Sequence, residues 1–380
     1  MAGLRATTAG AGLFLSAAAG LAVGLAPPAI GMAPPSVLAP PAPSLSLVSW
    51  AVDGVSCQDG ARPVFSRSPD VSPSLNYGNV SSDLTVTFRI APDGRPLGVT
   101  REGTGYLEGA NDVLPALVAA RFAAGQAHNG CSIRFVAVRQ PIASASRELA
   151  TEYSVFPDGP PPRELWDRAR PIGSDCFEPA PEPLLRAFPA FKELPGEPGR
   201  RNWSMIGFDL DAGGRPIRPS VVTGSGNAAL DAASVRAVAA SRFEKGARHG
   251  CRYPYYRNAV VLPAPPPPSE ESLRPAGSTC PTDLPFVQPP TLTFPEEYRK
   301  RSIEGWAVLA FDVAPWGEIG NIRVLAAEPA ASFGEWAKQV IGNARKPAGR
   351  TGYVDCTDRV LFKMGPTARI FTTTGPAPQS

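Results

Sequence analysis

Six cysteines and two histidines are the residues of this chain whose chemistry depends most on spacing. The consecutive cysteine pairs are separated by 74, 75 and 76 residues. This near-constant separation favours three disulfides over the other possible connectivities. The predicted pairs are Cys57 with Cys131, Cys176 with Cys251, and Cys280 with Cys356. An even number of cysteines is typical of an exported protein that folds in an oxidising compartment.

The sequence contains few residue patterns that could bind a metal or a cofactor or catalyse a reaction. His128 and His249 each stand just before a cysteine, but a disulfide sulfur has no thiolate to give a metal. No complete phosphate-binding glycine loop and no G-x-S-x-G motif occurs. We therefore expect no metal, no cofactor and no enzymatic activity. The net charge of +3 gives no indication of nucleic acid binding.

An aromatic cluster is one candidate for partner binding. Tyr253, Tyr255 and Tyr256 follow Cys251 in a predicted strand. They form either a half-buried strand or an adhesive edge, because exposed aromatic side chains suit binding surfaces.

A basic run is the second candidate. Arg299, Lys300 and Arg301 end a short predicted helix. They form either a solvated face of that helix or a site for an acidic partner.

The cysteine spacing belongs to an internal repeat of about 90 residues per copy. A strand that ends in a glycine turn recurs from Phe88 to Gly94, from Phe208 to Gly214 and from Phe311 to Gly317. The motif R-P-x-G-S-x-C precedes Cys176 and Cys280, whereas the first copy keeps only Gly54 and Ser56 before Cys57. The chain therefore contains three divergent copies of one unit.

The third copy predicts the architecture of the unit. A short charged helix, an apolar strand, a return strand, a second helix and a last strand are expected at residues 294–301, 306–313, 319–325, from 332 onward, and 356–364. Ser332 and Glu335 have the spacing of a capping box at the start of the second helix. The expected fold class is α+β: tandem small domains, each a three-stranded antiparallel sheet with two helices and one disulfide.

The third copy also resembles the C-terminal domain of the TonB family of energy transducers. The resemblance rests on Phe294-Pro295, the basic run at 299–301, Ile303-Glu304-Gly305 and the strand that follows. The second copy matches less well, and the first is degenerate. The resemblance implies that each copy binds a partner by pairing a strand to a sheet edge. The last strands, at 131–138, 251–261 and 356–364, would be those edges, with Val360 and Phe362 as further candidate contacts.

The N-terminal segment predicts export. Arg5 precedes an uncharged apolar run, so residues 1–31 are expected to be a cleaved signal peptide, with an uncleaved anchor as the alternative. The other expected segments are a Pro-rich spacer at 32–46, repeat 1 at 47–142, a linker at 143–169, repeat 2 at 170–262, a Pro-rich linker at 263–273, repeat 3 at 274–366 and a flexible tail at 367–380. Proline-rich linkers are semi-rigid, so separated units are expected.

Three functions remain open at this point. The first is a protein of the Gram-negative periplasm that binds envelope proteins or peptides, including outer-membrane receptors, by strand addition. The second is a membrane-anchored transducer for outer-membrane transport, which requires the N-terminal segment to be retained. The third and weakest is a disulfide-stabilised spacer. In none of them is a nucleic acid or a small-molecule cofactor expected, and contact with the membrane requires an uncleaved N-terminal segment.

Overall fold

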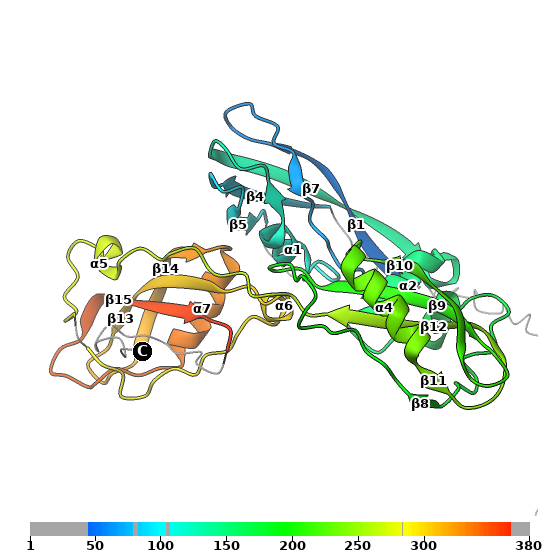
Figure 1. The fold of residues 1–380 in the computed structure, drawn as a ribbon. Helices are drawn as coiled ribbons and strands as arrows, with labels where there is room; N and C mark the ends of the chain where they lie inside the picture. Colours follow the sequence, from blue (N-terminus) through cyan, green and yellow to red (C-terminus); the bar gives the residue numbers. More distant parts are fainter. Residues whose placement is uncertain (1–44, 79–82, 104–106, 283, 366–380) are drawn as a thin grey trace, which may run out of the picture. The chain divides into compact units, whose positions relative to one another are not determined.

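The computed structural model describes residues 45–365 apart from 79–82, 104–106 and 283 (Figure 1). The predicted signal peptide at 1–31, nearly all of the spacer and the tail at 367–380 lie outside the described residues. Within the described part, no helix is long and apolar enough to cross a membrane. The chain combines small antiparallel sheets, short helices and three disulfides, which is consistent with tandem small domains.

The first repeat is built on a five-stranded antiparallel sheet of order β3-β1-β7-β4-β5. Its strands are β1 (Ser46–Ser56), β3 (Ser74–Asn76), β4 (Leu84–Ile90), β5 (Pro96–Arg101) and β7 (His128–Pro141). Alternate residues of β4 are buried, as a strand with one core face requires. Helix α1 (Val113–Ala119) packs beside β5, and the short strands β2 (Phe65–Arg67) and β6 (Arg121–Phe122) pair with each other.

The expectation of a three-stranded sheet is wrong for this repeat. The additional strands β1 and β3 extend the sheet beyond β7. The physical reason lies in β1, whose residues from Leu47 to Val52 are mostly apolar and include no proline, so that they favour a strand. Helix α1 stands where the second helix of the unit was expected, whereas β2 and β3 lie in the described residues ahead of β4, where the order of the unit places an opening helix.

The second repeat has the expected three-stranded sheet, in the order β10-β9-β12. Its elements are β8 (Pro183–Leu185), β9 (Asn202–Leu210), β10 (Pro216–Gly224), α4 (Ala228–Ala240), β11 (Arg242–Phe243) and β12 (Arg248–Arg257). The Asn227 side chain caps α4 by accepting from the Leu230 N–H at 3.0 Å. Instead of a helix, turns precede β9, because Pro189, Pro195 and Pro198 interrupt that stretch.

The third repeat follows the predicted order of helix, strand, strand, helix and strand. Its elements are α6 (Glu296–Lys300), β13 (Gly305–Val313), β14 (Ile319–Glu328), α7 (Ser332–Gly342) and β15 (Tyr353–Phe362), with sheet order β14-β13-β15. The predicted capping box is wrong: Ala331 is the N-cap, and the Ser332 hydroxyl lies 2.7 Å from the hydroxyl of the buried Tyr298. Pairing with Tyr298 fixes the start of α7 to α6.

All three repeats close with a disulfide in the pairing that the spacing favours. The bonds join Cys57 to Cys131, Cys176 to Cys251 and Cys280 to Cys356, and none of the six cysteines is free. In the second and third repeats the bond ties the last strand to the segment that precedes the sheet, whereas in the first it ties β7 to the end of its neighbour β1.

The segments between repeats are folded rather than extended. Helices α2 (Arg147–Val155) and α3 (Arg163–Ala169) lie in the predicted linker and share a small core with Leu47 of β1. The second Pro-rich segment contains α5 (Glu270–Leu273), and its Pro265 carbonyl accepts from the Trp306 indole at 2.7 Å. These segments use their apolar and carbonyl groups to cover neighbouring sheets.

The expectation of separated units is wrong for repeats 1 and 3. Phe88 and Ile133 of the first repeat belong to the same hydrophobic cluster as Phe311 and Phe333 of the third. The backbone of Val99 in β5 also bonds Pro329 and Ala331 at 3.0 Å each. A shared core stabilises both repeats. The composition of the linkers does not predict this contact, because it depends on side chains of the repeats themselves.

Candidate functional site

The last strands of the three repeats differ in the number of strands with which they pair. In the first repeat β7 pairs with β4 on one side and β1 on the other. In the described part of the chain, β12 pairs with β9 alone and β15 pairs with β13 alone. The expected edge at 131–138 is therefore wrong, whereas 251–257 and 356–362 do lie on edge strands. An edge strand presents unpaired backbone N–H and C=O groups that another strand can bond.

The two edge strands are unequal. Pro254 stands in the middle of β12, opposite Met205 of β9. Proline has no N–H, so it weakens the capacity of that edge to bond a further strand. Strand β15 contains no proline from Tyr353 to Phe362. We therefore regard β15 as the candidate partner-binding edge.

Local contacts define which part of β15 is open. At its start, the Thr279 N–H donates to the Val354 carbonyl at 3.1 Å, and the Val354 N–H donates to the Thr279 hydroxyl at 2.9 Å. Further along, the Arg359 guanidinium lies 3.6 Å from Glu270 of α5. The disulfide loop thus covers the beginning of the strand, and α5 and Pro268 contact Arg359 further along. The backbone from Cys356 to Phe362 pairs with β13 on one side.

Val360 and Phe362 lie on this strand but are fully buried. The Phe362 ring contacts Phe333 at 5.2 Å and the half-buried Phe294 at 5.7 Å between centroids. Their side chains belong to the core of the third repeat. Because these two side chains are buried, a partner at this edge can contact only the backbone of β15 and the apolar side chains at the border of the core.

The predicted tyrosine cluster divides between the faces of β12. Tyr255 is buried, and its hydroxyl donates to the Ala187 carbonyl at 2.9 Å, while burial raises the pKa of that hydroxyl. Tyr253 is half-buried beneath the guanidinium of Arg186, 4.7 Å from the ring centroid. Tyr256 is about half exposed and meets the Phe156 ring edge-on. Only Tyr256 projects from the strand as a surface aromatic residue.

The basic run also divides. Arg299 forms two hydrogen bonds with the exposed Glu296, at 2.7 and 2.8 Å, and Lys300 is exposed. Arg301 is buried and makes an ion pair of 2.5 Å with Asp112 of the first repeat. Burial disfavours the charged forms of both side chains. The pairing nevertheless holds the pKa of Asp112 below its usual value and raises the pKa of Arg301. Arg301 is therefore a structural residue that joins repeats.

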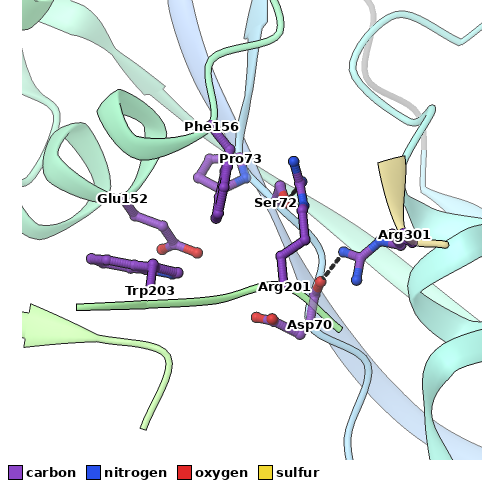
Figure 2. A pocket seen from close by; sticks show the side chains of 8 residues that line it. All are labelled: Asp70, Ser72, Pro73, Glu152, Phe156, Arg201, Trp203 and Arg301. Carbon is purple, nitrogen blue, oxygen red and sulfur yellow. Dashed lines mark hydrogen bonds between the residues drawn. The ribbon is translucent and has the colours of Figure 1, made fainter. Parts of the chain in front are cut away.

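Arg301 also lines a small polar cavity where three repeats meet (Figure 2). It donates to the carbonyls of Asp70 and Gly199. Arg201 of the second repeat lies 4.1 Å over the Phe156 ring and donates to the Ser72 hydroxyl at 2.8 Å. The three hydrogen bonds join residues more than a hundred positions apart, so no local sequence pattern indicates them.

Glu152 of α2 faces the same cavity, where its carboxylate lies above the Trp203 ring (Figure 2). Burial, with the nearby Asp70 carboxylate, raises the pKa of Glu152 to about 7. We therefore expect the charge of Glu152 to change near neutral pH. Glu152 lies in the predicted linker at 143–169, and no sequence motif marks it as a candidate site residue.

The histidines do not approach each other. His128 lies 2.6 Å from Asp59, and His249 lies 4.0 Å from Asp209 in another repeat. Among the residues that the structure describes, no group of three His, Cys, Asp or Glu side chains is arranged to hold a metal ion.

Comparison with known proteins gives one informative match. No protein-family model matches the chain. A stretch of 122 residues is 31% identical to Protein TonB of Salmonella typhimurium, covering 30% of this chain and 50% of that protein. The chain thus spans about half the length of the relative it matches. The match indicates that part of this chain is TonB-like.

Proposed function

We propose that this chain is an exported envelope protein, without enzymatic activity, that binds a partner protein or peptide by strand addition to β15. The observation that carries the proposal is the difference between strands at corresponding positions of the proposed repeats. Strand β7 has neighbours on both sides, whereas β15, at the corresponding position of the third repeat, has a neighbour on one side. The pairing of β1 with β7 in the first repeat supports the proposal that an additional strand fits at this position.

The chemistry of β15 supports the same role. Backbone hydrogen bonds give affinity in strand addition, and side-chain pockets at alternate positions give specificity. The half-buried Phe294 borders the edge beside Phe362 and offers an apolar contact to an added strand. The similarity to Protein TonB and the three disulfides support a location in the cell envelope, with the periplasm as the proposed compartment.

The proposal is tested by photo-crosslinking in a Gram-negative host. A photoreactive phenylalanine analogue replaces Leu361 on β15, and in a matched control it replaces Lys338 on the exposed face of α7. We expect the chain to crosslink to an envelope protein from position 361 and not from position 338. Equal crosslinking from both positions, or none from position 361, contradicts binding at this edge.

A further inference from the structure

A groove with a volume of about 760 Å³ adjoins the small cavity of Figure 2 and is lined by residues of all three repeats. The groove and the cavity share Ser72, Pro73, Phe156 and Arg201 in their walls. The volume lies within the range of known ligand pockets. In the described part of the chain, no residue of β15 lines the groove, so it is separate from the edge proposed above.

The two sequence candidates for partner binding meet in this groove. Tyr256, near the end of β12, and Arg299 with Lys300, in α6, line its walls although they belong to different repeats. The structure adds Tyr77, which follows β3 and is 56% exposed. Tyrosine rings that stay exposed in a concave surface are available to a partner, and tyrosine is enriched where proteins bind one another.

Carboxylates dominate the charge of the groove. Five carboxylates and three basic side chains line it, although the whole chain carries a net charge of +3. Glu296 is paired with Arg299, and Asp112 is paired with Arg301. Three carboxylates of the groove have no ion-pair partner among the residues that the structure describes: Glu108, Asp158 and Glu297. This local excess of negative charge attracts a cationic ligand.

Aromatic rings stand close to this negative charge. The Glu108 carboxylate accepts a hydrogen bond from the Tyr77 N–H at 3.0 Å, so a carboxylate and an exposed tyrosine are adjacent in the wall. A guanidinium or ammonium group is attracted to the face of a tyrosine ring as well as to a carboxylate. One such contact exists within the wall itself, because the Arg201 guanidinium lies 4.1 Å from the centroid of Phe156, which meets Tyr256 edge-on.

Amide side chains favour a polypeptide over a simple polyamine as the cationic ligand. Asn111 and Asn258 are exposed and line the groove. Each of these side chains carries donors and an acceptor, as a peptide group does, so the two kinds of group can bond reciprocally. A protonated polyamine offers donors alone and would leave the asparagine N–H groups without an acceptor.

We propose that this groove binds a segment of a partner polypeptide that carries at least two lysine or arginine side chains. One cationic group contacts Tyr77 and Glu108, and another contacts Tyr256. Because every repeat contributes to the walls, the site exists only where the three repeats are packed together. The inference goes beyond the proposed function and does not depend on strand addition at β15.

The test measures binding of a fluorescently labelled peptide, Ala-Arg-Ala-Arg-Ala-Arg-Ala, to the full-length chain by fluorescence anisotropy. A peptide with glutamine in place of each arginine is expected to bind at least about tenfold more weakly, because it lacks the charge. The dissociation constant of the arginine peptide is expected to rise with added NaCl, which screens the attraction. Equal binding of the two peptides overturns the proposal.

Substitutions locate the peptide in the groove. Glu108→Gln removes a charge but keeps an oxygen for the Tyr77 N–H, and it is expected to raise the dissociation constant about fivefold. Tyr256→Ala removes a half-exposed ring and is expected to raise it about threefold. Glu335→Gln, on the exposed face of α7 and outside the groove, is the control and is expected to change it less than about twofold. Unchanged binding in the first two variants, or an equal loss in all three, contradicts this site.

Spermidine distinguishes a polyamine from a polypeptide, because it carries the same number of positive charges as the arginine peptide. We expect it to compete with the peptide at least about tenfold more weakly than unlabelled peptide does. Competition at equal concentration would assign the groove to a polyamine and overturn the proposal. The Glu108→Gln and Tyr256→Ala variants are expected to crosslink from position 361 as the unmodified chain does, so the failure of either proposal leaves the other intact.

Discussion

Arg301 is the residue at which the packing of the repeats is most sensitive to a single change. Its charge is buried and is balanced by Asp112, with backbone carbonyls completing its hydrogen bonds. Removing the counter-ion of a buried charge lowers the free energy of unfolding strongly. The intact pair itself adds little to that free energy, because its attraction is offset by the desolvation of both charges. The importance of the pair lies in what happens when one member is lost.

We expect Asp112→Asn to lower the free energy of unfolding by about 3 kcal/mol, because the Arg301 charge loses its buried partner. Urea denaturation followed by tryptophan fluorescence measures the change. The matched control is Glu296→Gln, which removes the exposed partner of Arg299 and is expected to cost less than about 1 kcal/mol. Similar losses in both variants would mean that Arg301 does not depend on Asp112.

The raised pKa of Glu152 predicts that stability depends on pH with the opposite sign to that of an ordinary paired carboxylate. Its pKa is raised to about 7 in the folded chain, against an ordinary value of 4.5 for a glutamate. The folded state therefore retains the proton over this interval and loses stability as the pH rises from about 4.5 to about 7. Above pH 7 the full cost of the buried charge is present.

Glu152→Gln is expected to stabilise the protein by about 2 kcal/mol at pH 8 and to have little effect at pH 5. Chemical denaturation at the two pH values gives the difference. Glu148→Gln, on the exposed face of the same helix, controls for the loss of charge and is expected to change stability by less than about 0.5 kcal/mol. A gain from Glu152→Gln that is the same at both pH values would contradict the assignment.

At the scale of elements, the glycine that recurs at the end of the repeated strand has a direct structural cause in the hairpin turn. In the third repeat the turn is closed by the Ala314 N–H and the Glu318 carbonyl at 2.8 Å. Gly317 has a φ of +88°, and a Cβ there would clash with the Lys346 carbonyl oxygen. Gly94 and Gly214 occupy the same conformation in the other copies. The glycine that marks the repeat in the sequence is thus the residue that the turn requires.

Gly317→Ala is accordingly expected to destabilise the third repeat by at least about 2 kcal/mol, from backbone strain and the clash together. Thermal or urea unfolding measures the loss. Gly320→Ala, in the following strand, has no atom within 4 Å of the added Cβ and provides the control. Equal tolerance of the two substitutions would show that the turn adapts to a side chain.

Local patterns predicted much of the third repeat and little of the first. The strands and helices of the third repeat were foreseeable because their apolar periodicities are long and are bounded by prolines and glycines. The pairing of β1 with β7 joins segments far apart in the chain, and only the apolar, proline-free character of 47–52 signalled it. Burial of Arg301, Val360 and Phe362 depends on tertiary contacts, which no local pattern contains.

At the scale of the whole molecule, repeats 1 and 3 are joined by a common hydrophobic cluster and by the Arg301–Asp112 pair. Units that share a core gain stability from each other, so they open together rather than independently. The described part of the chain from residue 45 onward is accordingly expected to contain a cooperative unit that is larger than one repeat.

Hydrogen exchange with mass spectrometry tests this cooperativity. Increasing urea is expected to expose the amides of β4 and β13 over the same concentration range, although these strands belong to different repeats. In Asp112→Asn both transitions are expected to move to lower urea concentration together. Exposure of β13 at an unchanged concentration in that variant would show that the two repeats unfold independently.

The order of the disulfides along the chain has a consequence for how this protein matures. Each cysteine is bonded to its immediate neighbour in the sequence: the first to the second, the third to the fourth, and the fifth to the sixth. A chain that enters an oxidising compartment from its N-terminus presents each pair complete before the next pair arrives. An oxidase that joins cysteines in order of appearance therefore produces the native set, and correct maturation needs no reshuffling of mismatched bonds.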